Sequence, residues 1–455
     1  MKQDCNALFA DLAAGVPADV RRLYDAGDFD AANRRIDRLL TQTRLPESGH
    51  NALLALREIM RRIPQYYTLT REQALAQMQA EVPDFTAEEL DALVAADRLD
   101  WRYVNREPRY LDRFLNALRL YPDMNSRGFA PDPSETENRD RMLAAMRERG
   151  ELTAQITLKA TVAPAPGLVT DPNAEWEAWL PIPADCEQQS GIEILDATPG
   201  GRIAPADAPQ RTIYWKTTAA QAPCTVTYRY RVRAEYHDMD ALVPDPVQPG
   251  FFTREQAPHI LFTPWLRALC ARIIAGCDGP VEKARAIYDY VTTNTNYRYQ
   301  PAYVCLENIS ENCAKSGWGD CGVMSLLFIT LCRIAGIPAR WQSGLYVTPK
   351  EAGCHDWAQF YIAPYGWLWA DCSFGSSAHR FGCEERRRHF FGNLDPLRMV
   401  ANREFYAQLT PPDNAWRNDP YDNQMGEAVL NGTPLHHEAL DTGVELVAFT
   451  WETPF

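Results

Sequence analysis

Residues 318–340 read WGDCGVMSLLFITLCRIAGIPAR, and the fold that we predict is organised around this stretch. Met324, Leu327, Phe328, Leu331 and Ile334 recur at helical spacing, which gives the segment one wide apolar face. Such a face must be covered by other parts of the chain. The pattern therefore predicts a largely buried helix.

Capping residues mark both ends of this helix. Asp320 stands at the N-cap position, where its side chain can accept hydrogen bonds from the first turn. Gly336 and Pro338 mark the C-terminal stop. Cys321 is thus the first helical residue, where the positive end of the helix dipole favours a nucleophilic thiolate. The alternative is a small buried hydrophobic residue, which is the commoner role of a free cysteine.

The composition describes an ordinary globular chain of 455 residues with a formal net charge of −14. This balance disfavours nucleic-acid binding, which needs a basic surface. The first residues carry an acidic side chain and no long apolar run, so we expect no secretory signal, and no stretch approaches the length of a membrane span. We predict a cytoplasmic protein with no membrane and no nucleic-acid partner. The oligomeric state stays open.

Twelve cysteines in a chain without a signal peptide indicate free thiols rather than a disulfide framework. No C-x-x-C pair occurs, so paired metal-ligand spacing is missing. A structural metal held by Cys305, Cys313, Cys354 and Cys372 is the alternative that we considered. We predict neither a metal nor another cofactor.

Residues 1–125 have helical patterns, and Thr86 with Glu89 matches a capping box ahead of one helix. Residues 126–150 form a Pro/Gly-rich linker followed by a charged helix that Gly150 ends. We predict an N-terminal helical domain over residues 1–125.

From residue 151 the hydrophobic period changes to two, in segments such as LTAQITLKATV and CTVTYRYRVRAEY. Several short strands at this spacing predict a β-sandwich over residues 151–240. A second Pro-rich linker follows, and residues 251–455 form the remaining domain. The predicted fold class is α+β and multidomain: a helical domain, a β-sandwich and a C-terminal catalytic domain.

Three residues of the last domain suit nucleophilic catalysis. Cys321 opens the buried helix, His355 begins the strand HDWAQFYI, and Asp371 lies in the next strand, WLWADCSFG. A thiol nucleophile needs a base, and the base needs an orienting acceptor, roles that cysteine, histidine and aspartate can fill. Each residue alone has a structural explanation. Together, in these contexts, they predict a catalytic triad.

The two strands form a predicted hairpin around APYG. Its register decides whether the side chains of His355 and Asp371 lie on the same face of the sheet, as the triad requires. His355 and Asp371 share a face if the numbers of paired residues sum to an even value, which requires an odd loop. One such register sets Ala363 opposite Trp367. Asp356 is a rival orienter, but its side chain is predicted to point to the opposite face of the strand.

These pieces resemble the transglutaminase-like superfamily, which has a papain-like thiol fold. The matching segments are GWGDCGVMSLLFITLCRIAGIPARW, CHDWAQFYI and WLWADCSFG, and the resemblance is specific over residues 251–375. It implies acyl transfer through a thioester. In that mechanism Cys321 is the nucleophile, His355 the general acid and base, and Asp371 the orienter.

An oxyanion hole needs hydrogen-bond donors aimed at the developing charge. The backbone N–H of Cys321 is the first candidate, and the indole of Trp318 or the amide of Asn312 is the second. Trp357, Trp369 and Tyr361 are candidates for the walls of the substrate cleft; the alternative is that they pack the strand against the helix.

Our first hypothesis is a thiol peptidase or amidase that hydrolyses peptide or isopeptide bonds of a peptide or protein-derived substrate. The second is a cross-linking enzyme that joins glutamine and lysine side chains, although no D-x-D-x-D-G calcium loop is present. The third is a binding scaffold without catalysis. The sequence does not identify the substrate.

Overall fold

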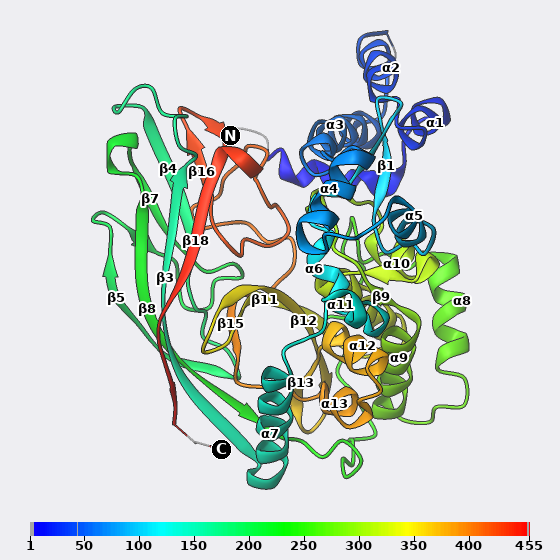
Figure 1. Ribbon diagram of the computed structural model, residues 1–455, viewed down its shortest axis with the longest axis vertical. Helices are drawn as coiled ribbons and strands as arrows, with labels where there is room; N and C mark the ends of the chain where they lie inside the picture. The colour runs from blue at the N-terminus through cyan, green and yellow to red at the C-terminus, as the bar shows by residue number, and fades with distance from the viewer. Residues whose placement is uncertain (1–3, 43, 453–454) are drawn as a thin grey trace.

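The computed structural model describes residues 4–42, 44–452 and 455. Long antiparallel strands occupy one side of the molecule and helices the other, with a further five-stranded sheet between them (Figure 1). Among the described residues, no helix is both long and apolar enough to cross a membrane. All twelve cysteines are free thiols.

The first 150 residues are mainly helical, as predicted. The Thr86–Glu89 capping box is present, and Gly150 ends the charged helix with a φ of 81°. Phe9 and Leu56 belong to the same buried apolar cluster as Phe328 and Phe360, so this region packs directly on the middle of the molecule. Its elements are η1 (Asn6–Ala14), α1 (Ala18–Asp25), α2 (Phe29–Gln42), α3 (Glu47–Arg62), η2 (Ile63–Gln65), α4 (Arg71–Glu81), α5 (Ala87–Ala95), β1 (Trp101–Val104), β2 (Glu107–Tyr110), α6 (Leu115–Leu118), η3 (Pro122–Arg127) and α7 (Pro133–Arg149).

Two antiparallel sheets share one apolar core that includes Ile156, Trp176, Trp215 and Tyr228. Their alternating buried side chains are the period-two pattern of the sequence. One sheet has the order β17 (Thr433–Pro434), β16 (Glu427–Leu430), β4 (Glu175–Pro181), β7 (Thr212–Thr218) and β6 (Arg202–Ile203). The other has the order β18 (Leu440–Trp451), β3 (Glu151–Pro164), β8 (Cys224–Glu235) and β5 (Gln189–Ala197).

The last strands of the chain lie in these two sheets. The predicted division at residue 251 instead assigns them to the catalytic domain. β18 pairs with β3, and β16 pairs with β4, although about 250 to 300 residues separate the partners along the chain. Residues 443–451, GVELVAFTW, have the alternating pattern of a strand, but local sequence does not reveal which sheet edge such a strand covers. The division of the chain into separately folding domains stays a prediction.

The central sheet has the order β14 (Phe391–Gly392), β13 (Gly366–Ala370), β12 (Ala352–Ile362), β11 (Ala339–Val347) and β15 (Arg398–Asn402). In the predicted hairpin, Tyr361 pairs with Trp367 and Ile362 with Gly366, so the paired numbers have the even sum that the triad requires. The remaining elements are α8 (Pro264–Ile273), α9 (Pro280–Asn294), β9 (Asn296–Tyr297), η4 (Ala219–Gln221), η5 (Tyr303–Cys305), α10 (Ile309–Ser316), β10 (Trp318–Gly319), α12 (Cys372–Arg380), α13 (Glu384–His389) and η6 (His437–Ala439).

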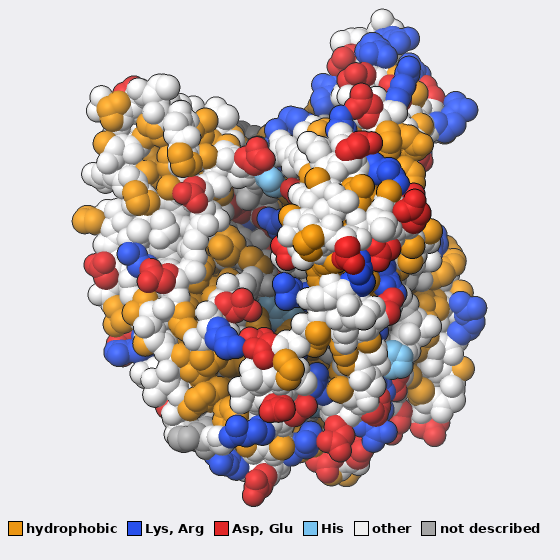
Figure 2. Space-filling view, viewed as in Figure 1, with side chains coloured by type: hydrophobic (Ala, Val, Ile, Leu, Met, Phe, Trp, Pro, Cys, Tyr) orange, Lys and Arg blue, Asp and Glu red, His pale blue; other side chains and the backbone are white. Residues whose placement is uncertain are grey.

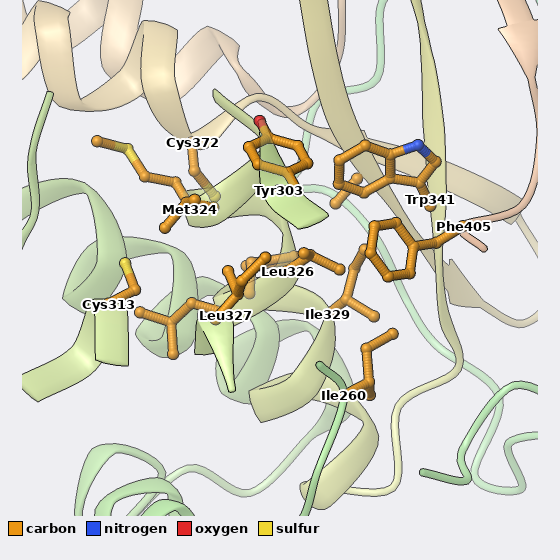
Figure 3. Packing of buried hydrophobic residues seen from close by; sticks show 14 of the residues in the cluster. Ile260, Tyr303, Cys313, Met324, Leu326, Leu327, Ile329, Trp341, Cys372 and Phe405 are labelled. Atoms are coloured by element: carbon orange, nitrogen blue, oxygen red, sulfur yellow. The ribbon is translucent and has the colours of Figure 1, made fainter. Parts of the chain in front are cut away.

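The predicted buried helix is α11 (Cys321–Ile334), and every residue from Cys321 to Arg333 is buried. Asp320 caps it by accepting a hydrogen bond from the Val323 N–H, and Gly336 follows its end with a φ of 80°. The helix therefore lies inside the molecule, as its apolar face predicts. Figure 3 shows its side chains Met324, Leu326, Leu327 and Ile329 packed among Ile260, Cys313, Trp341, Cys372 and Phe405.

We expect a chain that ends at Gly426 to lose cooperative folding, because the edges of β3 and β4 would then lack their partners β18 and β16. Thermal unfolding followed by circular dichroism should broaden, and binding of a hydrophobic dye should increase. A chain that ends at Trp451 keeps β16, β17 and β18 and is the matched control. A sharp transition at the wild-type temperature in the shorter chain would contradict this prediction.

Candidate active site

The Cys321 thiol lies at the N-terminus of α11, in a buried position. Asp320 caps the helix just before it, and the thiol Sγ donates a hydrogen bond to Oδ2 of Asp356, 3.2 Å away. Asp356 is on β12 and is only 3% exposed. The partner of the thiol is therefore a buried carboxyl group.

A tyrosine hydroxyl connects the two carboxyl groups nearest the thiol. Tyr303 Oη lies 2.9 Å from Oδ1 of Asp320 and 2.9 Å from Oδ2 of Asp356, and it accepts a hydrogen bond from the Gly322 N–H. The hydroxyl has a single proton, so it can donate to one carboxylate at a time. Both short contacts together require a proton on one of the two carboxyl groups.

Gln424 holds the strand at the same point. Its amide Nε2 donates to Oδ1 of Asp356 at 2.6 Å and to the backbone carbonyl of His355 at 3.1 Å. Both oxygens of the Asp356 carboxyl thus accept hydrogen bonds. This set of contacts fixes the direction in which the Asp356 side chain points.

Burial dominates the electrostatics of this site. It raises the pKa of Asp320 to about 6, and burial together with the charge of Asp320 raises the pKa of Asp356 to about 7. Burial, then Asp356 and Asp320, raise the pKa of the Cys321 thiol well above its ordinary value. The predicted thiolate is therefore wrong for the resting site, since burial and two carboxyl groups outweigh the helix dipole.

His355 and Asp371 form a close pair, as the hairpin parity predicts. His355 Nε2 lies 2.7 Å from Oδ2 of Asp371, and Arg398 Nη2 donates to the same oxygen at 2.8 Å. Asp371 also caps α12 by accepting the Phe374 N–H. Although burial acts in the opposite direction, His355 and then Arg398 hold the pKa of Asp371 well below its ordinary value.

The pair lies on the face of β12 that points away from Cys321. Side chains alternate along a strand, and the Asp356 side chain reaches the thiol while the His355 ring packs against Tyr346 and Phe374. The hydrogen bonds of the described residues include none between Cys321 and His355. Sequence reasoning correctly set His355 and Asp356 on opposite faces, but it was wrong about which of them contacts the thiol.

The physical reason is the apolar pattern of β12. Ala358 and Phe360 are fully buried, and the Phe360 ring contacts Phe328 of α11 at a centroid distance of 5.8 Å. Asp356 is two residues before Ala358, so its side chain lies on this helix-facing side. The register that buries the apolar residues therefore brings Asp356 to the start of the helix.

Trp318 does not lie where an oxyanion donor would be needed. Its ring packs under the Arg298 guanidinium at 5.3 Å and lines a cavity of about 440 Å³ whose lining does not include Cys321. Asn312 lines the same cavity and donates to the Glu307 carbonyl. Among the described residues, the backbone N–H of Cys321 has no hydrogen-bond acceptor, so it is the donor that remains.

The predicted aromatic walls are also placed elsewhere. Trp357 is fully buried and donates to Oε1 of Gln342, Trp369 is buried and stacks on His237, and Tyr361 packs edge-on against Trp367. All three share the face of His355 rather than that of Asp356. They are packing residues on the far side of the sheet from the thiol and from α11, so they neither line the cleft nor pack the strand against the helix, and both interpretations of the sequence were wrong for them.

The thiol opens instead into a cavity of about 410 Å³ that sequence reasoning missed. Figure 2 shows that the molecule is hollowed between the strands and the helices on this side. The tyrosines come from the segment NYRYQPAYV and the acids from NDPYDNQMG, whose repeated aromatic and acidic residues were the available signal. The lining includes Cys321, Asp320, Asp356, Asp419, Asp422, Gln424, Tyr66, Tyr297, Tyr299, Tyr303, Arg113, Cys354, His437 and Glu438.

The carboxyl groups around the thiol do not form a metal site in the part of the chain that the structure describes. In the described part of the chain, no group of three or more His, Cys, Asp and Glu side chains could hold a metal ion. Cys305, Cys313 and Cys372, which entered the alternative metal site, are buried free thiols.

Comparison with known proteins gives a family for the middle of the chain. Residues 267–372 match the family model of the transglutaminase-like superfamily, which confirms the resemblance that the sequence predicts. This stretch contains Cys321, His355 and Asp371. Mixed α/β architecture with a transglutaminase-like region is thus the fold of this part of the molecule.

The individual relatives are distant. The uncharacterized protein YebA of Bacillus subtilis (strain 168) is 28% identical over 123 residues, which are 23% of this chain and 16% of that relative. The crystal structure of a proposed cysteine protease from Cytophaga hutchinsonii is 16% identical, with a TM-score of 0.41, and the match covers 67% of this chain and 93% of that one. The periplasmic domain of TgpA from Pseudomonas aeruginosa is 14% identical, with a TM-score of 0.27 and coverage of 55% and 94%. A cytoplasmic location stays a prediction.

We expect Asp422→Asn to gain stability relative to wild type as pH rises from 5 to 8. Burial, and then Asp356, raise the pKa of Asp422 well above its ordinary value. A carboxyl group with a raised native pKa favours the folded state below its unfolded pKa, near 4, and loses this contribution as pH rises through the native pKa. Asparagine does not titrate.

The difference between variant and wild type in the free energy of unfolding should change by up to about 1.4 kcal/mol per pH unit, measured by urea denaturation. Asp196→Asn, an exposed substitution on β5, is the matched control. A difference that does not depend on pH would contradict the assignment.

Proposed function

We propose that this protein is a thiol-dependent acyl-transfer enzyme that hydrolyses amide or isopeptide bonds of a peptide or protein-derived substrate. The observation that carries the proposal is the Cys321 thiol. It lies at the N-terminus of a buried helix, opens into a cavity of about 410 Å³, and donates to a carboxyl group with a pKa of about 7. The family match over residues 267–372 supports the same assignment.

In the proposed reaction, the Cys321 sulfur attacks the carbonyl carbon of the amide and gives up its proton to a base. The C–N bond then breaks, and the amine leaves with that proton, which yields a thioester. Water attacks the thioester, releases the carboxylic acid and restores the thiol. The backbone N–H of Cys321 is available to stabilise the oxyanion in both steps.

We assign the role of the base to Asp356. Its Oδ2 is 3.2 Å from the sulfur, within the distance that proton transfer needs, whereas His355 is on the other face of β12. A carboxyl group with a pKa of about 7 accepts a proton more readily than an ordinary aspartate does. In this assignment His355, Asp371 and Arg398 hold the hairpin and the start of α12 in place.

We expect Cys321→Ala to abolish cleavage of a peptide library, because the covalent step is then impossible. Mass spectrometry of the products separates hydrolysis from amine transfer, since the two add water or the amine to the acyl group. Cys277→Ala, in the loop between α8 and α9, is the matched control and should retain activity. Incorporation of a labelled primary amine into glutamine peptides in place of hydrolysis would favour the cross-linking function instead.

Equal activity in Cys321→Ala and wild type would contradict catalysis at this thiol altogether. In that case the binding scaffold becomes the better description of the chain.

The base is identified by comparing Asp356→Asn with His355→Asn. We expect Asp356→Asn to lower kcat/KM by about 10²–10⁴-fold, the usual contribution of a general base. Wild-type kcat/KM should rise as pH increases through about 7, because Asp356 must be ionised to accept the proton. His355→Asn should lower the unfolding temperature and leave the pH profile unchanged.

The opposite pattern would contradict the assignment to Asp356. A folded His355→Asn protein whose kcat/KM falls as far as that of Cys321→Ala would make His355 the base, as the triad of the sequence predicts.

A further inference from the structure

Buried carboxyl groups surround the Cys321 thiol without a neutralising ion pair. Asp320, Asp356, Asp419 and Asp422 all line the cavity, and none of them has a Lys or Arg nitrogen within 4.0 Å among the described residues. Against them, the described lining contains Arg113 and His437 as basic side chains. The cavity wall therefore has an excess of acidic groups.

Other buried carboxyl groups in the chain form ion pairs with arginine. Arg398 contacts Asp371 at 2.8 Å and Asp395 at 2.9 Å, and Arg417 contacts Glu427 at 2.6 Å, with every side chain at most 3% exposed. A buried carboxylate is costly unless it is paired, so these arginines offset the cost of burying the acids. The fold supplies such partners at these sites and leaves the carboxyl groups at the thiol without them.

A second observation points from the cavity wall to a ligand. Asp422 is 2% exposed and lines the cavity. Its carboxyl group hydrogen-bonds with the side chains of Ser343 and Asp356, and among the described residues no N–H or hydroxyl group donates to its Oδ2. The charge of Asp356 acts directly on it. A buried acceptor oxygen without a donor loses the hydrogen bond that water would give it, so a donor supplied by a ligand would bind favourably there.

We propose that the cavity binds a positively charged side chain of the substrate, an ammonium or guanidinium group, beside the bond that Cys321 attacks. The inference rests on the proposed function and names its substrate class: a peptide or protein with Lys or Arg next to the cleaved amide. Asp422 accepts from the cation. The rings of Tyr297 and Tyr299 line the same cavity and add aromatic faces that attract cations.

The geometry gives Asp422 a role that Asp356 does not share. Asp356 already accepts from Cys321, Tyr303 and Gln424, so its oxygens are occupied. Asp422 makes no hydrogen bond with the thiol. It is therefore a specificity residue, and its replacement should change the charge preference of the cavity more than the reactivity of the sulfur.

The charge preference can be measured without turnover. Two methanethiosulfonate reagents of similar size, one with a trimethylammonium group and one with a sulfonate group, each convert a thiol to a mixed disulfide with release of methanesulfinate. The rate at Cys321 is read by mass spectrometry of its peptide, which separates it from the other eleven cysteines. We expect the cationic reagent to react at least about tenfold faster in wild type, since a cleft lined by one sign of charge concentrates the opposite sign.

Substitutions of Asp422 then test whether this residue causes the preference for the cationic reagent. Asp422→Asn should lower the cation-to-anion rate ratio at Cys321 by about threefold or more, and Asp422→Glu should retain it because the charge is kept. Asp196→Asn on β5 removes the same charge far from the cavity and should leave the ratio at its wild-type value. A wild-type ratio near one, or an unchanged ratio in Asp422→Asn, would overturn the proposal.

Turnover gives the second readout. Amide substrates with lysine beside the cleaved bond should have a higher kcat/KM than matched norleucine substrates, and Asp422→Asn should reduce this preference mainly by raising KM for the lysine substrate. Equal kcat/KM for the two substrates would overturn the proposal. If the reagents discriminate by charge at Cys321 but no amide is cleaved, the cationic subsite is supported and the hydrolase function fails, so the two failures are distinguishable.

Discussion

The packing of α11 against one face of β12 sets the chemistry of the Cys321 thiol. Ala358 and Phe360 of the strand and Phe328 of the helix are fully buried in this contact. Because strand side chains alternate, burying these residues also brings Asp356 to the helix N-terminus and turns His355 away. A shift of one residue in the register would exchange the two, but it would also expose the apolar face of the strand.

The N-terminus of a helix is usually taken to lower the pKa of a cysteine. At Cys321 the thiol is buried and lies next to two carboxyl groups, and these factors raise its pKa. The helix dipole contributes a partial charge near its first turn, whereas Asp320 and Asp356 contribute whole charges when ionised. In the reaction that we propose, Cys321 therefore starts as a thiol and must lose its proton, so the neighbouring acceptor matters more than the resting ionisation state.

The distribution of arginines separates the two faces of β12. On the His355 face, Arg398 is fully buried, neutralises Asp371 and stacks near Tyr346 and Phe374. Such a cluster stabilises the hairpin and the start of α12. On the Asp356 face the carboxyl groups have hydrogen bonds but, among the described residues, no Lys or Arg nitrogen within 4.0 Å, and this difference is the basis of the cationic subsite that we propose.

The sequence by itself determined the buried helix with its caps, the alternating strands, the β12–β13 hairpin and the resemblance to the transglutaminase-like superfamily. These are local features, because helical and strand periodicity, capping residues and turns act over a few neighbouring positions. The even-sum register of the hairpin was only a condition for the triad, and the structure meets it with Tyr361 rather than Ala363 opposite Trp367. The sequence did not determine the partner of Cys321, the role of Trp318 and Trp357, or the place of β18. Those depend on which face of a strand packs on a helix and on pairings between residues nearly 300 positions apart, and only the tertiary structure decides them, since either face of an isolated strand and any free sheet edge offers similar local interactions.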